Sequence, residues 1–255
     1  MTPSHDPVPP VSIWLRRRIV LDRVVAAVLA VLSAPVVAVI GALVARHDGG
    51  PALIRVPRSG RGGREFGMWK LRSMRVEQAD GRATGASLTS SDDDRITPIG
   101  RRIRGLHLDE LPQLWNVVAG DMCLLGPRPE APPYVESEDP AWSAVLRVPP
   151  GIAGPTQLVV GEWELRSIDA DETGDAYRSV VLPVKLAIDG WYVERSSVRV
   201  DLGVVVTLVR HVLTGRDGTW LEREVTAAVP SVGPALHGDG DAPLDRAGAH
   251  DGGLS

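Results

Sequence analysis

The longest apolar stretch of the chain lies near its N-terminus, where residues 24–45 contain no charged side chain. A helix over these 22 residues would be about 33 Å long, which is enough to cross the hydrocarbon core of a bilayer. Pro35 interrupts the run, and a proline inside a helix removes a hydrogen bond and bends the axis. Arg16, Arg17 and Arg18 precede the run and further arginines follow it, so the positive-inside rule places both flanks in the cytoplasm.

This pattern favours residues 11–47 as a re-entrant membrane helix hairpin, which breaks at Pro35 and enters and leaves the same leaflet. Two alternatives stay open, a single helix that spans the bilayer and a buried helix of a soluble core. A cleaved signal peptide does not fit, because the apolar run is too long and a basic segment follows it directly.

The rest of the chain alternates between short strands and amphipathic helices. Residues 48–75 are typical of two strands joined by a tight glycine-rich turn at residues 60–63. Residues 109–120 and 201–213 show helical periodicity, and the second helix could lie in the core or partly in the membrane interface. We therefore expect an α/β (α+β) fold, helix-rich with a small β-sheet, with an N-terminal re-entrant membrane helix hairpin and interfacial amphipathic helices.

The two ends of the chain lack this periodicity. Residues 1–10 are rich in proline, and residues 230–255 are rich in glycine, aspartate and alanine, so both segments are expected to be disordered. Residues 48–220 form the expected cytoplasmic domain, which holds all of the candidate chemistry.

Charge is unevenly distributed along the chain. The net charge is −4, yet residues 11–75 contain twelve Arg or Lys and only three Asp or Glu. A basic region beside an apolar segment favours an anionic membrane surface or phosphate ligands, and we expect membrane lipids and no nucleic acid as partners. The single Cys123 excludes an internal disulfide and fits a reducing compartment.

Two adjacent carboxylates, Asp109 and Glu110, stand at the start of one expected helix. Asp109 is the expected N-cap, and the helix dipole would keep both groups ionised. An ionised carboxylate can attack phosphorus or hold a divalent cation, but the pair could equally be a plain cap and a solvated first-turn acid. Apolar spacing predicts a buried helix face made of Leu111, Leu114, Trp115 and Val118.

Cations that could bind phosphate occur at two other places. Arg128 stands between Pro127 and Pro129, a stiff turn that fixes the direction of a guanidinium able to grip phosphate. Lys70 and Arg72 share one face of the second expected strand, where they form either a phosphate site or a solvated basic face.

Residues 109–129, DELPQLWNVVAGDMCLLGPRP, resemble the signature of the bacterial sugar transferase family, the monotopic polyprenyl-phosphate phosphoglycosyl transferases. Residues 50–74, GPALIRVPRSGRGGREFGMWKLRSM, and residues 149–158, PPGIAGPTQL, resemble two further blocks of that family. The chain departs from the family pattern at Ala34, at Gly105, Leu106 and His107, and at Ala153.

The resemblance implies an enzyme of the inner membrane, with a catalytic domain that faces the cytoplasm. It would transfer a sugar 1-phosphate from a UDP-sugar to polyprenyl (undecaprenyl) phosphate and release UMP, the initiating step of exopolysaccharide or surface glycan synthesis. Asp109 would be the nucleophile, and Glu110 would hold Mg²⁺. Contacts with phosphate or nucleotide are implied for Lys70, Arg72, Arg104, Arg128 and Gln157.

Two other interpretations stay open. The chain could be a non-catalytic, membrane-anchored protein that binds nucleotide sugar or scaffolds a glycan assembly complex, although the intact Asp109–Glu110 pair argues against it. It could also transfer the sugar phosphate in one step, with Asp109 acting only as a base. The sequence names neither the sugar nor the polyprenyl length, and it leaves a homo-oligomer open.

Overall fold

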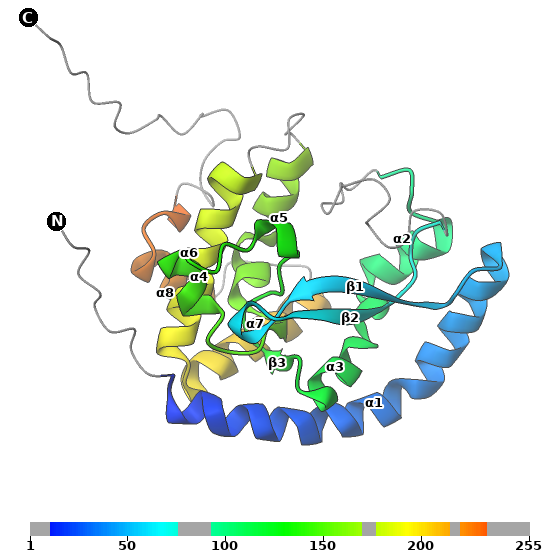
Figure 1. Ribbon diagram of the computed structural model, residues 1–255, viewed down its shortest axis with the longest axis horizontal. Helices are drawn as coiled ribbons and strands as arrows, with labels where there is room; N and C mark the ends of the chain where they lie inside the picture. The colour runs from blue at the N-terminus through cyan, green and yellow to red at the C-terminus, as the bar shows by residue number, and fades with distance from the viewer. Residues whose placement is uncertain (1–10, 76–92, 170–176, 215–219, 234–255) are drawn as a thin grey trace, which may run out of the picture.

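The computed structural model describes residues 11–75, 93–169, 177–214 and 220–233, and Figure 1 shows how they are arranged. A helix-rich fold with small sheets and one long apolar N-terminal helix is confirmed. The elements in chain order are α1 (Ile13–Asp48), β1 (Leu53–Ser59), η1 (Arg61–Gly63), β2 (Glu65–Leu71), α2 (Pro98–Gly105), η3 (Leu108–Glu110), α3 (Gln113–Ala119), β3 (Cys123–Leu125), η4 (Pro132–Tyr134), α4 (Pro140–Val145), β4 (Gly151–Ala153), α5 (Pro155–Asp169), η5 (Tyr177–Val181), α6 (Leu182–Arg195), α7 (Val198–Thr214) and α8 (Trp220–Ala228).

The expected disorder at the two ends falls mostly outside the described residues, which omit residues 1–10 and 234–255. Within the described part, Val232 is fully buried in the main hydrophobic core. The packed structure therefore extends beyond residue 230, where the sequence pattern placed the start of the tail.

Helix α1 is continuous and curves along one side of the molecule (Figure 1). The Ser12 side chain caps its start by accepting a hydrogen bond from the Leu15 N–H at 3.1 Å, and Gly49 ends it in the left-handed conformation. The two-helix hairpin with a break at Pro35 is not confirmed, because the helix continues across this residue. Proline removes one hydrogen bond from the helix, and the turns on both sides of Pro35 remain helical.

One face of α1 packs against the protein, closely up to Ala30 and again from Gly41, with partly buried residues between them. The buried residues of this face are Leu15, Arg18, Asp22, Ala26, Ala30, Gly41 and Val44. The opposite face exposes valine and leucine side chains from Val20 to Leu43. By length and composition, Ile13–His47 could cross a membrane. The helix therefore packs against the domain with one face and exposes an apolar surface with the other.

The β1–β2 hairpin agrees with the two strands predicted from residues 48–75. Its strands are antiparallel, in register from Leu53 opposite Leu71 to Ser59 opposite Glu65. The connection is the glycine-rich turn η1, in which Gly62 has a φ of 69°. This left-handed conformation explains why the turn contains glycine.

A second sheet, which was not predicted from the sequence, is formed by β3 and β4. The two short strands are parallel, with Cys123 opposite Gly151. A Cβ atom on Gly151 would lie only 2.1 Å from the backbone nitrogen of Gly126. Glycine is required there for close backbone packing, which fixes the segment that leads to Arg128.

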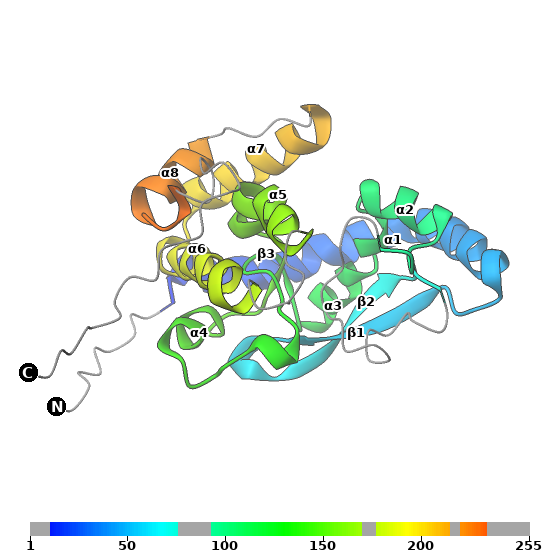
Figure 2. The ribbon, with the colours of Figure 1, turned by 90° about the horizontal axis from the view of Figure 1, so that it is seen from above.

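The largest hydrophobic core lies among α5, α6, α7 and α8. Figure 2 shows α7 and α8 on one side of α1 and the β1–β2 hairpin on the other. Helix α7 buries Val200 and Val204. The apolar stripe that gives residues 201–213 their helical periodicity is exposed instead, and consists of Leu202, Val205, Val206, Val209, Val212 and Leu213. The core-helix interpretation of this stripe is wrong, which leaves the interfacial one open.

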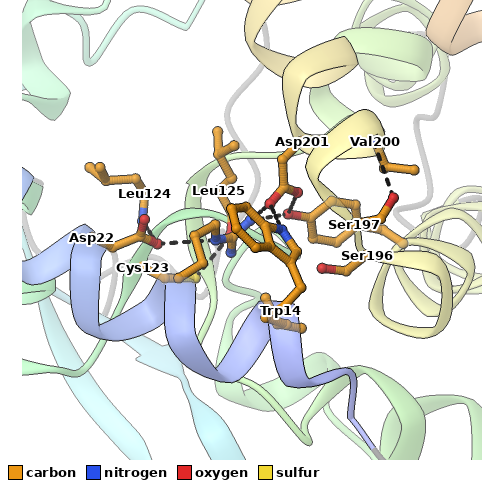
Figure 3. Close-up of polar contacts among 12 residues, drawn as sticks. Trp14, Asp22, Cys123, Leu124, Leu125, Ser196, Ser197, Val200 and Asp201 are labelled. Atoms are coloured by element: carbon orange, nitrogen blue, oxygen red, sulfur yellow. Dashed lines mark hydrogen bonds and ion pairs between the residues drawn. The ribbon is translucent and has the colours of Figure 1, made fainter.

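A buried ionic cluster joins α1 to α6 and α7 (Figure 3). We call Trp14, Arg18, Asp22, Tyr192 and Asp201 the anchor cluster. The Asp201 carboxylate accepts hydrogen bonds from the Trp14 indole, the Arg18 guanidinium and the Tyr192 hydroxyl, each at 2.7 Å. The Arg18 Nε also lies 3.5 Å from Asp22 Oδ2.

The anchor cluster also holds β3 through its backbone. The Leu124 N–H donates to Asp22 at 3.1 Å, and the Arg18 guanidinium donates to the Leu125 carbonyl (Figure 3). Because β3 leads directly into the turn that carries Arg128, the N-terminal helix helps to fix the position of this turn. Arg18 is consequently buried and is not one of the exposed basic residues that flank the apolar run.

Candidate active site

Asp109 and Glu110 lie in the single turn η3, and Asp109 is not the N-cap that the sequence predicted. The following helix α3 starts after Pro112, and no side chain caps it. His107, just before η3, has a φ of 53°, the only positive φ at a non-glycine residue in the described part of the chain. The side chains of Asp109 and Glu110 are only 7% and 10% exposed. The interpretation of Glu110 as a solvated first-turn acid is therefore wrong.

The buried face of α3 also differs from the expected one. Trp115 and Val118 are exposed. The buried residues are Gln113, Leu114, Asn116 and Val117. Asn116 tolerates burial because both ends of its amide are hydrogen-bonded to β2, its Oδ1 to the Trp69 N–H at 2.9 Å and its Nδ2 to the Gly67 carbonyl at 3.0 Å.

Two cationic side chains approach the two carboxylates, and a third side chain, Gln157, contacts one of these cations. The Lys70 Nζ lies 3.1 Å from Glu110 Oε1 and 3.9 Å from Asp109 Oδ2. The Arg128 Nη2 lies 3.4 Å from the same Glu110 oxygen, and its Nη1 donates to Gln157 Oε1 at 3.0 Å. We call these five residues the carboxylate cluster. Sequence reasoning had nominated each of them.

The two carboxylates differ in their electrostatics. Burial raises the pKa of Asp109, although the charge of Lys70 opposes the shift. Burial would also raise the pKa of Glu110, but the charges of Lys70 and Arg128 outweigh it and lower the pKa to about 2. Glu110 is therefore ionised throughout the physiological range, while Asp109 is a desolvated carboxyl whose ionised form is less stabilised.

Arg104 and Arg72, the two other nominated cations, occupy different surroundings. Arg104 is half-buried in the last turn of α2, close enough for its charge to lower the pKa of Asp109. The structure does not bring Arg72 to the carboxylate cluster. It is 1% exposed, and its guanidinium donates to the backbone carbonyls of Pro51 at 2.7 Å and Met74 at 3.2 Å.

Arg72 does not share the face of Lys70 because strand β2 ends at Leu71. The alternation of side chains along the strand therefore stops before Arg72. The Arg72 guanidinium instead binds backbone carbonyls next to the hairpin. A phosphate role for it gains no support from these contacts.

A second group of buried charges supports Arg128 and was missed by sequence reasoning. Glu130 Oε2 accepts hydrogen bonds from the Tyr177 hydroxyl at 2.6 Å and from Lys185 at 3.0 Å. Lys185 also lies 2.7 Å from Glu164 on α5. The only sequence signal was a lysine among apolar neighbours at the start of α6, since the carboxylate partners of Lys185 are 55 and 21 residues away.

The carboxylate cluster is suited to phosphoryl chemistry. It combines a buried carboxylate with no close ion pair, an ionised carboxylate and two cations that can bind phosphate oxygens. The described residues contain no group of three or more His, Cys, Asp or Glu side chains that could hold a metal ion. Mg²⁺ commonly uses only one or two carboxylates together with substrate phosphates and water, so Glu110 fits that pattern of coordination.

The chain is similar to several proteins that are named as undecaprenyl-phosphate sugar phosphotransferases. A UDP-glucose:undecaprenyl-phosphate glucose-1-phosphate transferase of Caulobacter vibrioides is 38% identical over 211 residues, which are 82% of this chain and 73% of that protein. A UDP-N-acetylgalactosamine-undecaprenyl-phosphate N-acetylgalactosaminephosphotransferase of Aeromonas hydrophila is 35% identical, over 75% of this chain and 43% of that protein. An undecaprenyl-phosphate glucose phosphotransferase of Komagataeibacter xylinus is 33% identical, over 82% of this chain and 38% of that protein.

The chain thus spans most of the first relative but less than half of the length of the other two. The family model described as bacterial sugar transferase matches residues 14–215. This range includes all of α1 except its first residue, the β1–β2 hairpin and every residue of the carboxylate cluster. The chain therefore belongs to the bacterial sugar transferase family.

Proposed function

We propose that the protein transfers a sugar 1-phosphate from a UDP-sugar to undecaprenyl phosphate, and so starts the synthesis of an exopolysaccharide or another surface glycan. The observation that carries this proposal is the carboxylate cluster, in which a buried Asp109 stands beside a Glu110 that two cations keep ionised. The relatives named above act on glucose or on N-acetylgalactosamine derivatives, so their names leave the sugar open.

The reaction proceeds in two displacements. An oxygen of the Asp109 carboxylate attacks the phosphorus that bears the sugar, the bond from this phosphorus to the UMP phosphate breaks, and UMP leaves with the electron pair. An oxygen of undecaprenyl phosphate then attacks the same phosphorus, the acyl phosphate bond breaks, and the Asp109 carboxylate is restored. The weak pairing of Asp109, with its nearest cation 3.9 Å away, leaves its oxygens available for this attack.

The cations of the cluster hold the diphosphate in place. Lys70 and Arg128 each use one contact on Glu110, and their remaining N–H groups can donate to phosphate oxygens. Gln157 accepts a hydrogen bond from Arg128 and so fixes the plane of its guanidinium. Glu110 would hold Mg²⁺, which when bound would neutralise charge on the diphosphate and on the leaving UMP.

The exposed apolar faces of α1 and α7 would seat the enzyme on the membrane. A helix that spans a bilayer needs lipid or other membrane helices around it, whereas one face of α1 packs against the domain. This supports insertion into a single leaflet, with both flanks and the domain at the cytoplasmic face of the inner membrane. The site then faces the headgroup plane, where the phosphate of the lipid acceptor lies.

The topology is tested with reporter tags at residues 5 and 240 of the full chain. Both tags should be cytoplasmic if α1 enters and leaves the same leaflet. A periplasmic tag at residue 5 together with a cytoplasmic tag at residue 240 would show that α1 spans the bilayer, and would reject this arrangement.

The activity is tested by measuring UMP release from a panel of UDP-sugars, with undecaprenyl phosphate and Mg²⁺ present. One sugar should give UMP and a lipid-linked product in equal amounts, and EDTA should abolish turnover. Glu110→Gln should lose most of the activity while membrane binding stays intact, because it keeps the shape of the side chain but removes its charge. Binding of UDP-sugars without any UMP release would instead support the non-catalytic scaffold.

A further inference from the structure

Arg58 lies next to the turn that carries Arg128, although nothing in the sequence separates it from the other arginines of the hairpin. It is half-buried near the end of β1. The N–H of the following residue, Ser59, donates to the Glu130 carbonyl at 2.9 Å, so this end of the strand is fastened two residues beyond Arg128. Arg58 is therefore held at the edge of the carboxylate cluster by backbone contacts.

The guanidinium of Arg58 makes few contacts with the described residues. Its Nη1 donates to the adjacent Pro57 carbonyl at 3.0 Å, and no carboxylate among the described residues lies within ion-pair distance of it. Burial lowers its pKa, and the charge of Arg128 lowers it further, against the opposing effects of Glu130 and Glu110. Arg58 thus shares its surroundings with the charges of the candidate site.

The nearby carboxylates are already engaged. Glu110 Oε1 accepts from Lys70 and Arg128. Glu130 Oε2 accepts from Tyr177 and Lys185 at 2.6 and 3.0 Å. Two guanidinium groups that are close together in a partly desolvated place repel each other, and an anion between them removes the repulsion.

We propose that Arg58 is a further substrate-binding residue, which together with Arg128 grips a phosphate group of one of the two substrates. A guanidinium presents a planar fork of N–H donors that matches phosphate oxygens, and two such forks can bind one phosphate from two sides. The inference rests on the proposed function, which supplies two sources of phosphate. One source is the diphosphate of the UDP-sugar, and the other is the phosphate of the lipid acceptor.

The chain offers a matched control on the same strand. Arg55 is exposed, and its guanidinium stacks over the Trp69 ring at 4.1 Å. Arg55→Gln removes the same charge from the same strand as Arg58→Gln. General loss of positive charge from the hairpin would affect both variants, whereas loss of a phosphate contact would affect only the second.

The experiment uses the full chain in detergent, with unfolding temperatures recorded for each variant. Binding of UDP is measured by calorimetry, and KM is measured for the UDP-sugar and for undecaprenyl phosphate. Arg58→Gln should weaken UDP binding and raise the KM for the UDP-sugar by at least about tenfold, the usual effect of losing a hydrogen bond to a charged group. Arg55→Gln should match the wild type. If only the KM for undecaprenyl phosphate rises, the phosphate that Arg58 binds is that of the acceptor.

Unchanged UDP binding and unchanged KM values in Arg58→Gln would overturn the inference. If that variant does not fold, Arg58→Met keeps the aliphatic part of the side chain but removes the charge and the N–H donors. A loss of binding in it supports the inference, and full wild-type binding overturns it. The experiment separates the proposed function from the role of Arg58. A wild-type protein that neither binds UDP nor releases UMP rejects both. A fully active wild type with an unaffected Arg58→Gln rejects only the role of Arg58.

Discussion

The anchor cluster and the carboxylate cluster are both buried groups of charges, but they differ in how completely their charges are satisfied. In the anchor cluster, the Asp201 carboxylate accepts three hydrogen bonds of 2.7 Å. In the carboxylate cluster, Asp109 has its nearest cation, Lys70, at 3.9 Å. Both aspartates are about equally hidden, with side chains 7% exposed. Burial alone therefore does not distinguish a structural aspartate from the proposed nucleophile.

The difference follows from what each cluster must do. A buried ion pair is most stable when hydrogen bonds satisfy its donors and acceptors, and in the anchor cluster the Asp201 carboxylate has three such partners from the chain itself. Among the described residues, Asp109 has weaker support than Asp201, with Lys70 at 3.9 Å, and burial is the largest effect on its pKa, which it raises. A desolvated and weakly paired carboxylate is destabilised in the absence of a ligand, which suits a nucleophile.

The comparison predicts its largest effect for Asp109→Asn. This variant should lose at least about 10⁴-fold in kcat, as enzymes do when a nucleophile is removed. Its unfolding free energy at pH 7 should be unchanged or higher, because the substitution removes a buried charge that burial disfavours. Turnover assays and urea unfolding measure the two effects. A marked loss of stability would show that Asp109 is a structural residue like Asp201.

Asp201→Asn should have the opposite signature. It should lower the unfolding free energy by about 3 kcal/mol, because Arg18 stays buried and loses one of its two carboxylates. The control is Arg199→Gln on the same helix, whose ion pair with Glu224 is exposed and contributes less than about 1 kcal/mol. Equal stabilities of the two variants in urea would contradict the structural role of the anchor cluster.

The pH dependence of the first half-reaction should reflect Asp109 and not Glu110. The UMP burst rate should fall as the pH drops through the raised pKa of Asp109, above the ordinary aspartate value near 3.9. The raised pKa of Asp109 also affects the free energy of unfolding. As the pH rises towards this pKa, the ionising Asp109 carboxyl increasingly disfavours the folded state. Asp109→Asn should therefore stabilise the protein more at pH 7 than at pH 4. A burst rate that falls only near pH 2 would assign the dependence to Glu110.

The smallest predicted effect concerns the backbone that presents the carboxylates. His107 has a φ of 53°, a conformation that favours glycine over other residues by about 1 kcal/mol. His107→Gly should leave the unfolding free energy unchanged or raise it slightly, and should keep turnover. His107→Val should lower it by about 1 kcal/mol. If the valine variant is as stable as the glycine variant in urea, the turn is not strained.

The carboxylate cluster could be predicted largely because its residues lie in short segments that resemble a known signature. Asp109, Glu110 and Arg128 come from one contiguous stretch, and the β1–β2 hairpin that carries Lys70 follows strand alternation and turn glycines. The predicted N-cap failed for a local reason. Asp109 lies within a 3-10 turn, and α3 starts only after Pro112. The apolar spacing did not reveal this.

The anchor cluster could not be predicted, because Arg18 and Asp201 are 183 residues apart. Within the apolar helix, Arg18 was indistinguishable from Arg16 and Arg17, which are exposed. The continuity of α1 across Pro35 was missed for a related reason. Its packing against the domain depends on residues that are distant in the sequence, and local rules for proline do not include that support.

The proposed two-step transfer requires Asp109 to be the nucleophile, and a single-turnover experiment tests this. Enzyme mixed with the UDP-sugar but no lipid acceptor should release UMP up to one equivalent and then stop. The peptide that contains Asp109 should gain the mass of a sugar phosphate, which hydroxylamine removes because the linkage is an acyl phosphate. If UMP appears only after undecaprenyl phosphate is added, with no modified peptide, the transfer is direct and Asp109 is not the nucleophile.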